Sequence, residues 1–474
     1  MRKLQSPGRK LPRGASMIES LESRLFFDVT VQVPAGQSVV FSAPDGTLAN
    51  LQFSNCAGSV TFAGDVTQGS ALNGTITVTG QTTTVSAINV TNATATSSVI
   101  LRAKTPNQIP LGNFTSDGPL KTVTLKQMTL DGNLDAPGIA MLNLGGMQNA
   151  NLQYAGFTGS QPFTLIAGNV TDSKITSADP FKSVTFGSFL STTPGNATAP
   201  GSSVLTAPGL WMIKVNGNMT ADLNLTGVGI AYGDDTLGRA MITGDVSAGH
   251  WNVQGNTWYM GAHSFGSQWS GVNAGYVWGF KTGQDFSGNW TVGSVTSATI
   301  GRNMTGATVK FTYDYSPTTY NFKNWTVGNN LQLSYMYGPG NFGKFSSQFM
   351  SNSYLLSGVT TPSFNLNAPT VFASPDAHFD SMNIHCHSTM INYADSYAAA
   401  PTFGNLNIGM VQTPNGGIPF GIRANKIIKQ LKMNFKNHTV NISNVLNATS
   451  VQDALTAAGI SPSDAQDFVT SFGP

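Results

Sequence analysis

Residues 217–220 read Gly-Asn-Met-Thr, and residues 244–247 repeat the pattern as Gly-Asp-Val-Ser. The same Gly-[Asn/Asp]-x-[Thr/Ser] motif, or a looser copy without the glycine, also occurs at 64–67, 168–171, 288–291, 302–305 and 323–326. From residue 168 the successive offsets are 49, 27, 44, 14 and 21 residues. Every offset except the one of 14 residues is close to one or two repeat units of roughly 22–25 residues, which indicates a stacked repeat architecture.

The segments between these turns have the period of β-strands. Apolar residues occupy every second position in Thr75–Thr79 and Lys121–Leu125, and helical periodicity is absent from most of the chain. We therefore expect an all-β fold, a right-handed parallel β-helix over residues 29–420, with stacked Asn side chains forming hydrogen-bonded ladders at the turns. A β-propeller is the main alternative, but its blades need four strands in roughly 40–50 residues and usually an aromatic signature.

Composition restricts the chemistry of the 474-residue chain. Only 10% of residues are charged and the net charge is +2, so no general attraction to nucleic acid or anionic lipid is expected. Glu19 and Glu22 are the only glutamates, which excludes glutamate-based catalysis from the body. No stretch approaches the roughly 20 apolar residues of a transmembrane helix. Cys56 and Cys386 are expected to be free thiols.

The N-terminal 28 residues differ from the body. A basic leader is followed by Leu21-Glu22-Ser23-Arg24-Leu25-Phe26-Phe27, without the apolar core of a secretory signal. This segment resembles the LEPRxLL-type motif of planctomycete-type secreted and surface proteins. It departs from that motif at Ser23, where the family has Pro, and at Phe26-Phe27. The resemblance implies export to the cell surface or the extracellular space. The alternative is the start of an amphipathic helix.

Residues 421–474 are expected to form a C-terminal strand and a two-helix cap. Apolar Leu431, Met433 and Phe435 alternate through a basic cluster, which predicts a strand with an exposed lysine-rich face. Ser450 is a candidate N-cap for a helix over about 450–458, which Gly459 would end. A second helix is predicted over about 462–471, with Pro462 at its first position.

Two groups of residues are candidates for acid–base or metal chemistry. The pair Asp234-Asp235 and the later Gly249-His250 resemble the acid pair and histidine of polygalacturonase-type glycosidases, but the Asn-Thr-Asp and Arg-Ile-Lys motifs of that family are missing. A plain turn is the alternative for the acid pair. No cofactor is predicted other than a divalent metal. Its nitrogen and oxygen ligands would come from Asp376, His378, Asp380, His385 and His387.

Aromatic residues are concentrated in one part of the chain. All seven tryptophans fall between residues 211 and 325. Exposed aromatic rings can stack on sugars, whereas aromatic stacks in the core are the alternative. The candidate ligand-binding residues are Trp251, Trp258, Trp269, Trp278 and Trp290.

Together these features predict an exported structural or adhesive protein that contacts extracellular polysaccharide or other surface proteins. The competing hypothesis is a polysaccharide-degrading hydrolase or lyase on the same scaffold. Fold alone does not decide between them.

Overall fold

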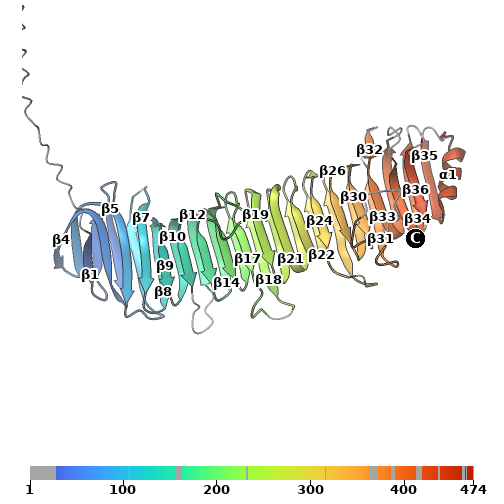
Figure 1. The fold of residues 1–474 in the computed structure, drawn as a ribbon. Helices are drawn as coiled ribbons and strands as arrows, with labels where there is room; N and C mark the ends of the chain where they lie inside the picture. Colours follow the sequence, from blue (N-terminus) through green and yellow to red (C-terminus); the bar gives the residue numbers. More distant parts are fainter. Residues whose placement is uncertain are drawn as a thin grey trace, which may run out of the picture.

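The computed structural model describes residues 28–105, 107–154, 163–230, 233–314, 316–362, 372–385, 390–412, 419–435, 438–461, 465 and 467–472. The leader and its LEPRxLL-like motif therefore lie outside the described residues, apart from Asp28. The part of the chain that the structure describes is all-β, with 68% strand and one helix, which confirms the predicted class. Its strands follow one another along an elongated stack from the N-terminal to the C-terminal end (Figure 1).

The body is built from rungs, each being one repeat of chain whose strands pair in parallel with the rungs before and after it. The strands fall into three columns. Column A consists of β8 (Leu120–Leu130), β10 (Ile139–Gln148), β12 (Phe163–Thr171), β14 (Phe181–Leu190), β16 (Leu210–Val215), β18 (Asp235–Ile242), β20 (Asn256–Ala262), β25 (Tyr320–Val327), β28 (Asn341–Ser347) and β31 (His378–Ile384).

Column B consists of β9 (Asn133–Ala136), β11 (Asn151–Tyr154), β13 (Lys174–Ser177), β15 (Val204–Ala207), β17 (Asp222–Leu225), β24 (Thr308–Phe311), β27 (Tyr335–Gly338) and β30 (Tyr354–Ser357). Column C includes β23 (Met304–Thr305), β26 (Asn330–Gln332), β29 (Phe349–Ser351) and β32 (Ile391–Ala394). Longer strands pass from one column into another, namely β19 (Asp245–Val253), β21 (Ser264–Thr282), β22 (Asn289–Ile300), β33 (Tyr397–Val411) and β34 (Phe420–Phe435). The last residues of β10, β12 and β14 likewise extend from column A into column C.

Antiparallel pairing distinguishes the N-terminal end from the body. Strand β4 pairs antiparallel with β1 and β5, and β3 pairs antiparallel with β2 and β6, before the parallel ladder continues through β7. These strands are β1 (Val29–Val33), β2 (Ser38–Ser42), β3 (Leu48–Ser54), β4 (Ala57–Leu72), β5 (Thr75–Thr91), β6 (Ser98–Ala103) and β7 (Ile109–Ser116).

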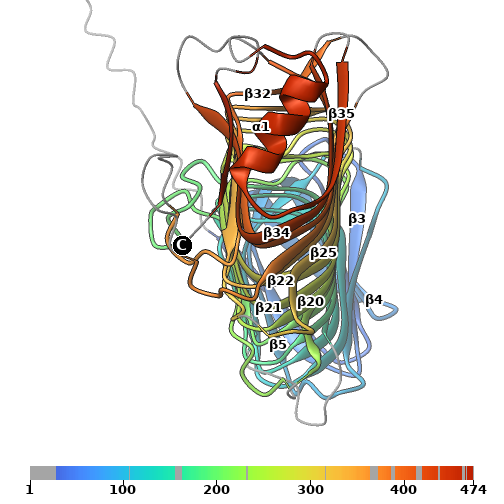
Figure 2. The same cartoon turned by 90° about the vertical axis from the view of Figure 1, so that its right-hand side faces the viewer.

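The C-terminal end combines a hairpin, one helix and a final strand. Strand β35 (His438–Val445) pairs antiparallel with β34, and α1 (Ala448–Ala457) follows it and lies across the end of the stack (Figure 2). The first predicted helix is confirmed, but its N-cap is Asn447 rather than Ser450. The second predicted helix is wrong over 468–471, because β36 (Phe468–Phe472) pairs in parallel with β34. Adding a strand satisfies the backbone groups of that edge.

The turn motif recurs in more than one column, which explains its irregular spacing. Val170, Met219, Val246 and Met304, from four copies, lie in column C. The copy at 288–291 begins β22 in column B, and that at 323–326 lies in β25 of column A. The 14-residue offset thus joins two columns of one rung. Rungs also vary in length, since the paired column C residues Val170, Phe189 and Met219 are 19 and 30 residues apart.

Polar side chains at the turns connect successive rungs. At one turn Asn303 accepts a hydrogen bond of 3.2 Å from Asn329, as predicted for stacked Asn side chains. The Asn224–Asn252 and Asn383–Asn407 hydrogen bonds, of 3.0 and 2.7 Å, lie inside strands instead.

A serine ladder, which the sequence reasoning missed, accompanies these Asn contacts. The N–H groups of Ser334 and Ser353 donate to the hydroxyls of Ser353 and Ser396, at 3.1 and 3.2 Å. All three serines are buried, so the ladder satisfies backbone groups that water does not reach.

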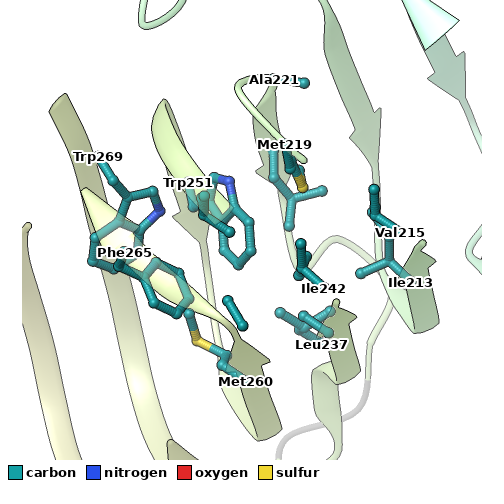
Figure 3. Packing of buried hydrophobic residues seen from close by; sticks show 14 of the residues in the cluster. Ile213, Val215, Met219, Ala221, Leu237, Ile242, Trp251, Met260, Phe265 and Trp269 are labelled. Carbon is teal, nitrogen blue, oxygen red and sulfur yellow. The ribbon is translucent and has the colours of Figure 1, made fainter. Parts of the chain in front are cut away.

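One continuous apolar core runs along the stack. Inward residues from the three columns meet in it, as shown for Ile213, Met219, Leu237, Trp251 and Phe265 in Figure 3. Because each rung covers its neighbour's apolar side chains, the main core is shared along the stack. A second, small cluster consists of Leu356, Val359, Tyr397 and Ala399.

Candidate functional site

Three exposed tryptophans lie in register on column A. Trp211 lies opposite Gly238, Gly238 opposite Trp258, and Trp258 opposite Trp278 on the successive strands β16, β18, β20 and β21. Their exposed fractions are 64% for Trp211, 48% for Trp258 and 49% for Trp278, the largest among the aromatic residues that the structure describes. We call these three residues the tryptophan row.

The strands of column A present the tryptophan row because each contains two successive outward residues. In β16, buried Leu210 and Ile213 flank outward Trp211 and Met212. In β21, buried Val277 and Phe280 flank Trp278 and its following glycine in the same way. This arrangement breaks the alternating period, so counting every second residue does not predict which tryptophans are exposed.

Neighbouring rings in the tryptophan row are close together. The Trp258 and Trp278 ring centroids are 5.9 Å apart with an interplanar angle of 40°. Strands are spaced by about 4.8 Å, so Trp211 and Trp258 are separated by about two such steps across Gly238. The half-buried Tyr259 ring lies against Gly261 and Gly279, where an added Cβ would be 2.8 and 3.0 Å from it. The result is an aromatic strip over four rungs that is interrupted at Gly238.

Trp251, Trp269 and Trp290 were predicted to contact a ligand, and for these three residues the prediction is wrong. Each is at most 1% exposed, as is Trp325, and together with Phe265, Phe280 and Phe286 they form an aromatic cluster in the core. Burial of these large side chains, with edge-to-face packing, stabilises the middle rungs instead. Of the five predicted ligand-binding residues, Trp258 and Trp278 remain accessible.

The acid pair lies beside the tryptophan row. Asp234 and Asp235 border a hollow of about 690 Å³ that also touches Trp211, Leu210 and Ile230. Burial, followed by the negative charge of Asp234, raises the pKa of the Asp235 carboxyl above its ordinary value. An acid with a raised pKa beside an aromatic surface is a chemically reasonable general acid, although one such shift does not make a catalytic site.

His250 is not brought to the acid pair by strand pairing. It lies in β19, whose neighbours are β17 and β21, whereas Asp235 begins β18, whose neighbours are β16 and β20. The imidazole Nδ1 of His250 is 2.8 Å from the Ser270 hydroxyl, and its backbone N–H donates to Asp222. The predicted Asp–Asp–His arrangement is therefore not assembled through the ladder.

The predicted metal ligands are only partly brought together. His378 Nε2 is 3.3 Å from Asp380 Oδ1 and 3.3 Å from the Tyr320 hydroxyl. Burial, followed by the hydrogen-bonded Asp380 carboxylate, raises the pKa of Tyr320. Asp376 instead forms an ion pair with Lys426.

The remaining predicted ligands are His385 and His387. The backbone N–H of His385, at the far end of β31, bonds to Ser347, and His387 lies outside the described residues. Within the described ranges, no three His, Cys, Asp or Glu side chains are grouped to hold a metal ion.

The comparisons with known proteins add no functional assignment. No protein-family model, curated protein or solved structure matches this chain at a significant level. Within the described residues, no helix has the length and apolar character needed to cross a bilayer.

Proposed function

We propose that this chain is an exported structural or adhesive protein of the cell surface or extracellular space that binds polysaccharide through the tryptophan row. We further propose that its body is a right-handed parallel β-helix. The three columns of parallel strands and the shared core support this architecture. The leader and the LEPRxLL-like motif support export.

The observation that carries the binding proposal is the exposure of three aligned indoles. Large aromatic side chains are normally buried, and four other tryptophans of this chain are buried. Leaving Trp211, Trp258 and Trp278 in water forgoes their burial energy, which indicates selection for contact with another molecule. Their alignment across rungs suits an extended ligand lying along the stack. The apolar C–H faces of a sugar chain have the matching shape and chemistry.

The test is binding of the purified chain to a panel of immobilised polysaccharides, with Trp258→Ala and Trp278→Ala as variants. We expect each variant to lose about tenfold or more in affinity, the equivalent of about 1.4 kcal/mol. The control is Trp325→Phe, which changes a buried indole and leaves the tryptophan row intact. Full binding by both alanine variants, or no binding of the parent to any polysaccharide, contradicts the proposal.

A second candidate function is glycosidic bond cleavage, which the hollow at Asp234 and Asp235 favours. Glycoside hydrolases use two carboxyl groups, and the one that donates the proton has a raised pKa, as burial gives Asp235 here. Release of reducing sugar by the parent chain, abolished in Asp234→Asn, would establish this activity. Binding without release would leave the adhesive function in place.

A further inference from the structure

Charged residues are segregated around the tryptophan row. Six exposed cations occupy outward positions of column A on both sides of the row and between its members, namely Lys182, Lys214, Arg239, Lys281, Lys323 and Lys344. No Asp or Glu occurs in the eight strand segments across which these positions are spread, namely 181–187, 210–215, 237–242, 257–262, 277–282, 295–300, 322–327 and 342–347. Asp235, which begins β18, and Asp234 lie just before the third of these segments. We call this surface the aromatic–basic face.

The segregation is notable because the whole chain is nearly neutral, with 24 basic and 22 acidic residues. None of the six cations forms an ion pair with a described residue, whereas Arg302 and Lys426 elsewhere pair with Asp285 and Asp376. These unpaired cations give the face a positive local potential that net charge does not reveal, with the acid pair Asp234-Asp235 at its edge beside Trp211. Such a surface is complementary to a polyanion.

The aromatic–basic face also contains a hollow of suitable size for part of a ligand. Gly261 lies opposite Met241 on one side and Lys281 on the other, and the absence of a side chain there leaves a hollow of about 360 Å³. Tyr259, Lys281 and His263 line this hollow. An aromatic ring and a cation thus line the same hollow, on the two strands that carry Trp258 and Trp278.

The spacing of the cations favours a polysaccharide over a nucleic acid. The six cations are distributed over eight rungs, and each rung advances about 4.8 Å. Duplex DNA carries one charge in about every 1.7 Å, several times more densely. Single strands are bound in positively charged grooves, whereas this surface is the face of a parallel sheet. A sugar chain with one anionic group in each residue or disaccharide fits the observed density better.

We infer that the aromatic–basic face selects an acidic polysaccharide, one that bears carboxylate or sulfate groups, over a neutral one. The indoles contact the sugar faces, and the cations contact the anionic groups through charge-assisted hydrogen bonds. This inference rests on the proposed polysaccharide binding and specifies the ligand class.

The experiment compares binding of the full chain to polygalacturonate and to the same polymer after complete methyl esterification, which removes charge but keeps the sugar chain. Dextran sulfate and unmodified dextran form a second pair, and an oligothymidylate tests for nucleic acid. We expect each anionic polymer to bind about tenfold more tightly than its neutral counterpart, with affinity falling as salt rises to about 0.15 M.

The variants separate charge from stacking. Lys281→Gln should lose about threefold in affinity for the anionic polymers and nothing for the neutral ones, as expected for one exposed ion pair. The matched control is Lys310→Gln, which removes the same single positive charge from column B and should bind as the parent does.

Each outcome has a distinct meaning. Equal binding of charged and neutral polymers, or equal losses in Lys281→Gln and Lys310→Gln, overturns the selectivity while the proposed polysaccharide binding stands. Tighter binding of oligothymidylate than of either anionic polysaccharide overturns the ligand class. Failure of every polysaccharide to bind removes the proposed function as well.

Discussion

The buried tryptophans permit a matched test of what one hydrogen bond contributes to the core. Trp290 Nε1 donates to Asn273 Oδ1 at 2.7 Å, and the asparagine is 2% exposed. Trp325 is equally buried, but its Nε1 has no hydrogen-bond partner among the described residues. Trp290→Phe and Trp325→Phe remove the same atoms from the same aromatic cluster. They differ in the polar group that each leaves behind.

The structure gives the direction and size of the difference. Trp290→Phe leaves the Asn273 amide oxygen buried without its donor, which costs about 1–3 kcal/mol in addition to the lost packing. Trp325→Phe removes an unpaired N–H and so loses packing alone. We therefore expect Trp290→Phe to be the more destabilising change, by about 2 kcal/mol.

The assay is urea unfolding followed by far-UV circular dichroism. Free energies are compared only if both variants show one transition with the parent's m value, since repeat arrays can lose cooperativity. Equal destabilisation by the two changes, or a greater cost for Trp325→Phe, would refute the reasoning. It would mean that the Asn273 contact has no net stabilising effect in this core.

Three further predictions concern the rungs. Gly238→Ala places a Cβ about 2.3 Å from the Trp211 carbonyl oxygen and should cost about 1–3 kcal/mol in urea unfolding, whereas Gly283→Ala meets nothing closer than 3.5 Å and should be near neutral. Ser353→Ala leaves the buried Ser334 N–H without its acceptor and should lower stability by about 1–3 kcal/mol; an unchanged midpoint would argue against the serine ladder. Because burial raises the pKa of Asp235 above 3.8, its ionisation opposes folding and stability falls as pH rises through that pKa. Asp235→Asn should therefore be more stable than the parent at neutral pH and lose this advantage below pH 3.8, and a thermal melt at both pH values decides it.

Much of the architecture could be predicted from local sequence. Alternation in Lys121–Leu125 predicted a strand, and Thr122, Val123 and Thr124 do pair in parallel with the next rung. The Asn303–Asn329 contact between turns also followed from composition, since an amide can both donate and accept a hydrogen bond. The rung length could not be predicted as accurately, because insertions at the turns change the number of residues without changing which strands pair.

The candidate site could be predicted only in part. Sequence located the tryptophans in one region, but Trp258 and Trp269 look alike there, and one is exposed while the other is buried. The difference arises from the two successive outward residues in column A, a feature of how each rung bends. The acid pair was found, whereas its neighbour Trp211, 23 residues earlier, was not connected with it.

The sequence alone determined that this is a stacked all-β protein with little charge and almost no glutamate, because strand periodicity, turn chemistry and composition are local properties. Tertiary structure decided which residues share a surface. Residues one rung apart are about 20 positions apart in the chain but adjacent across a strand pair, as Trp258 and Trp278 are. A row of indoles and a face of unpaired cations are therefore visible only once the rungs are placed in register, since register converts sequence separation into contact.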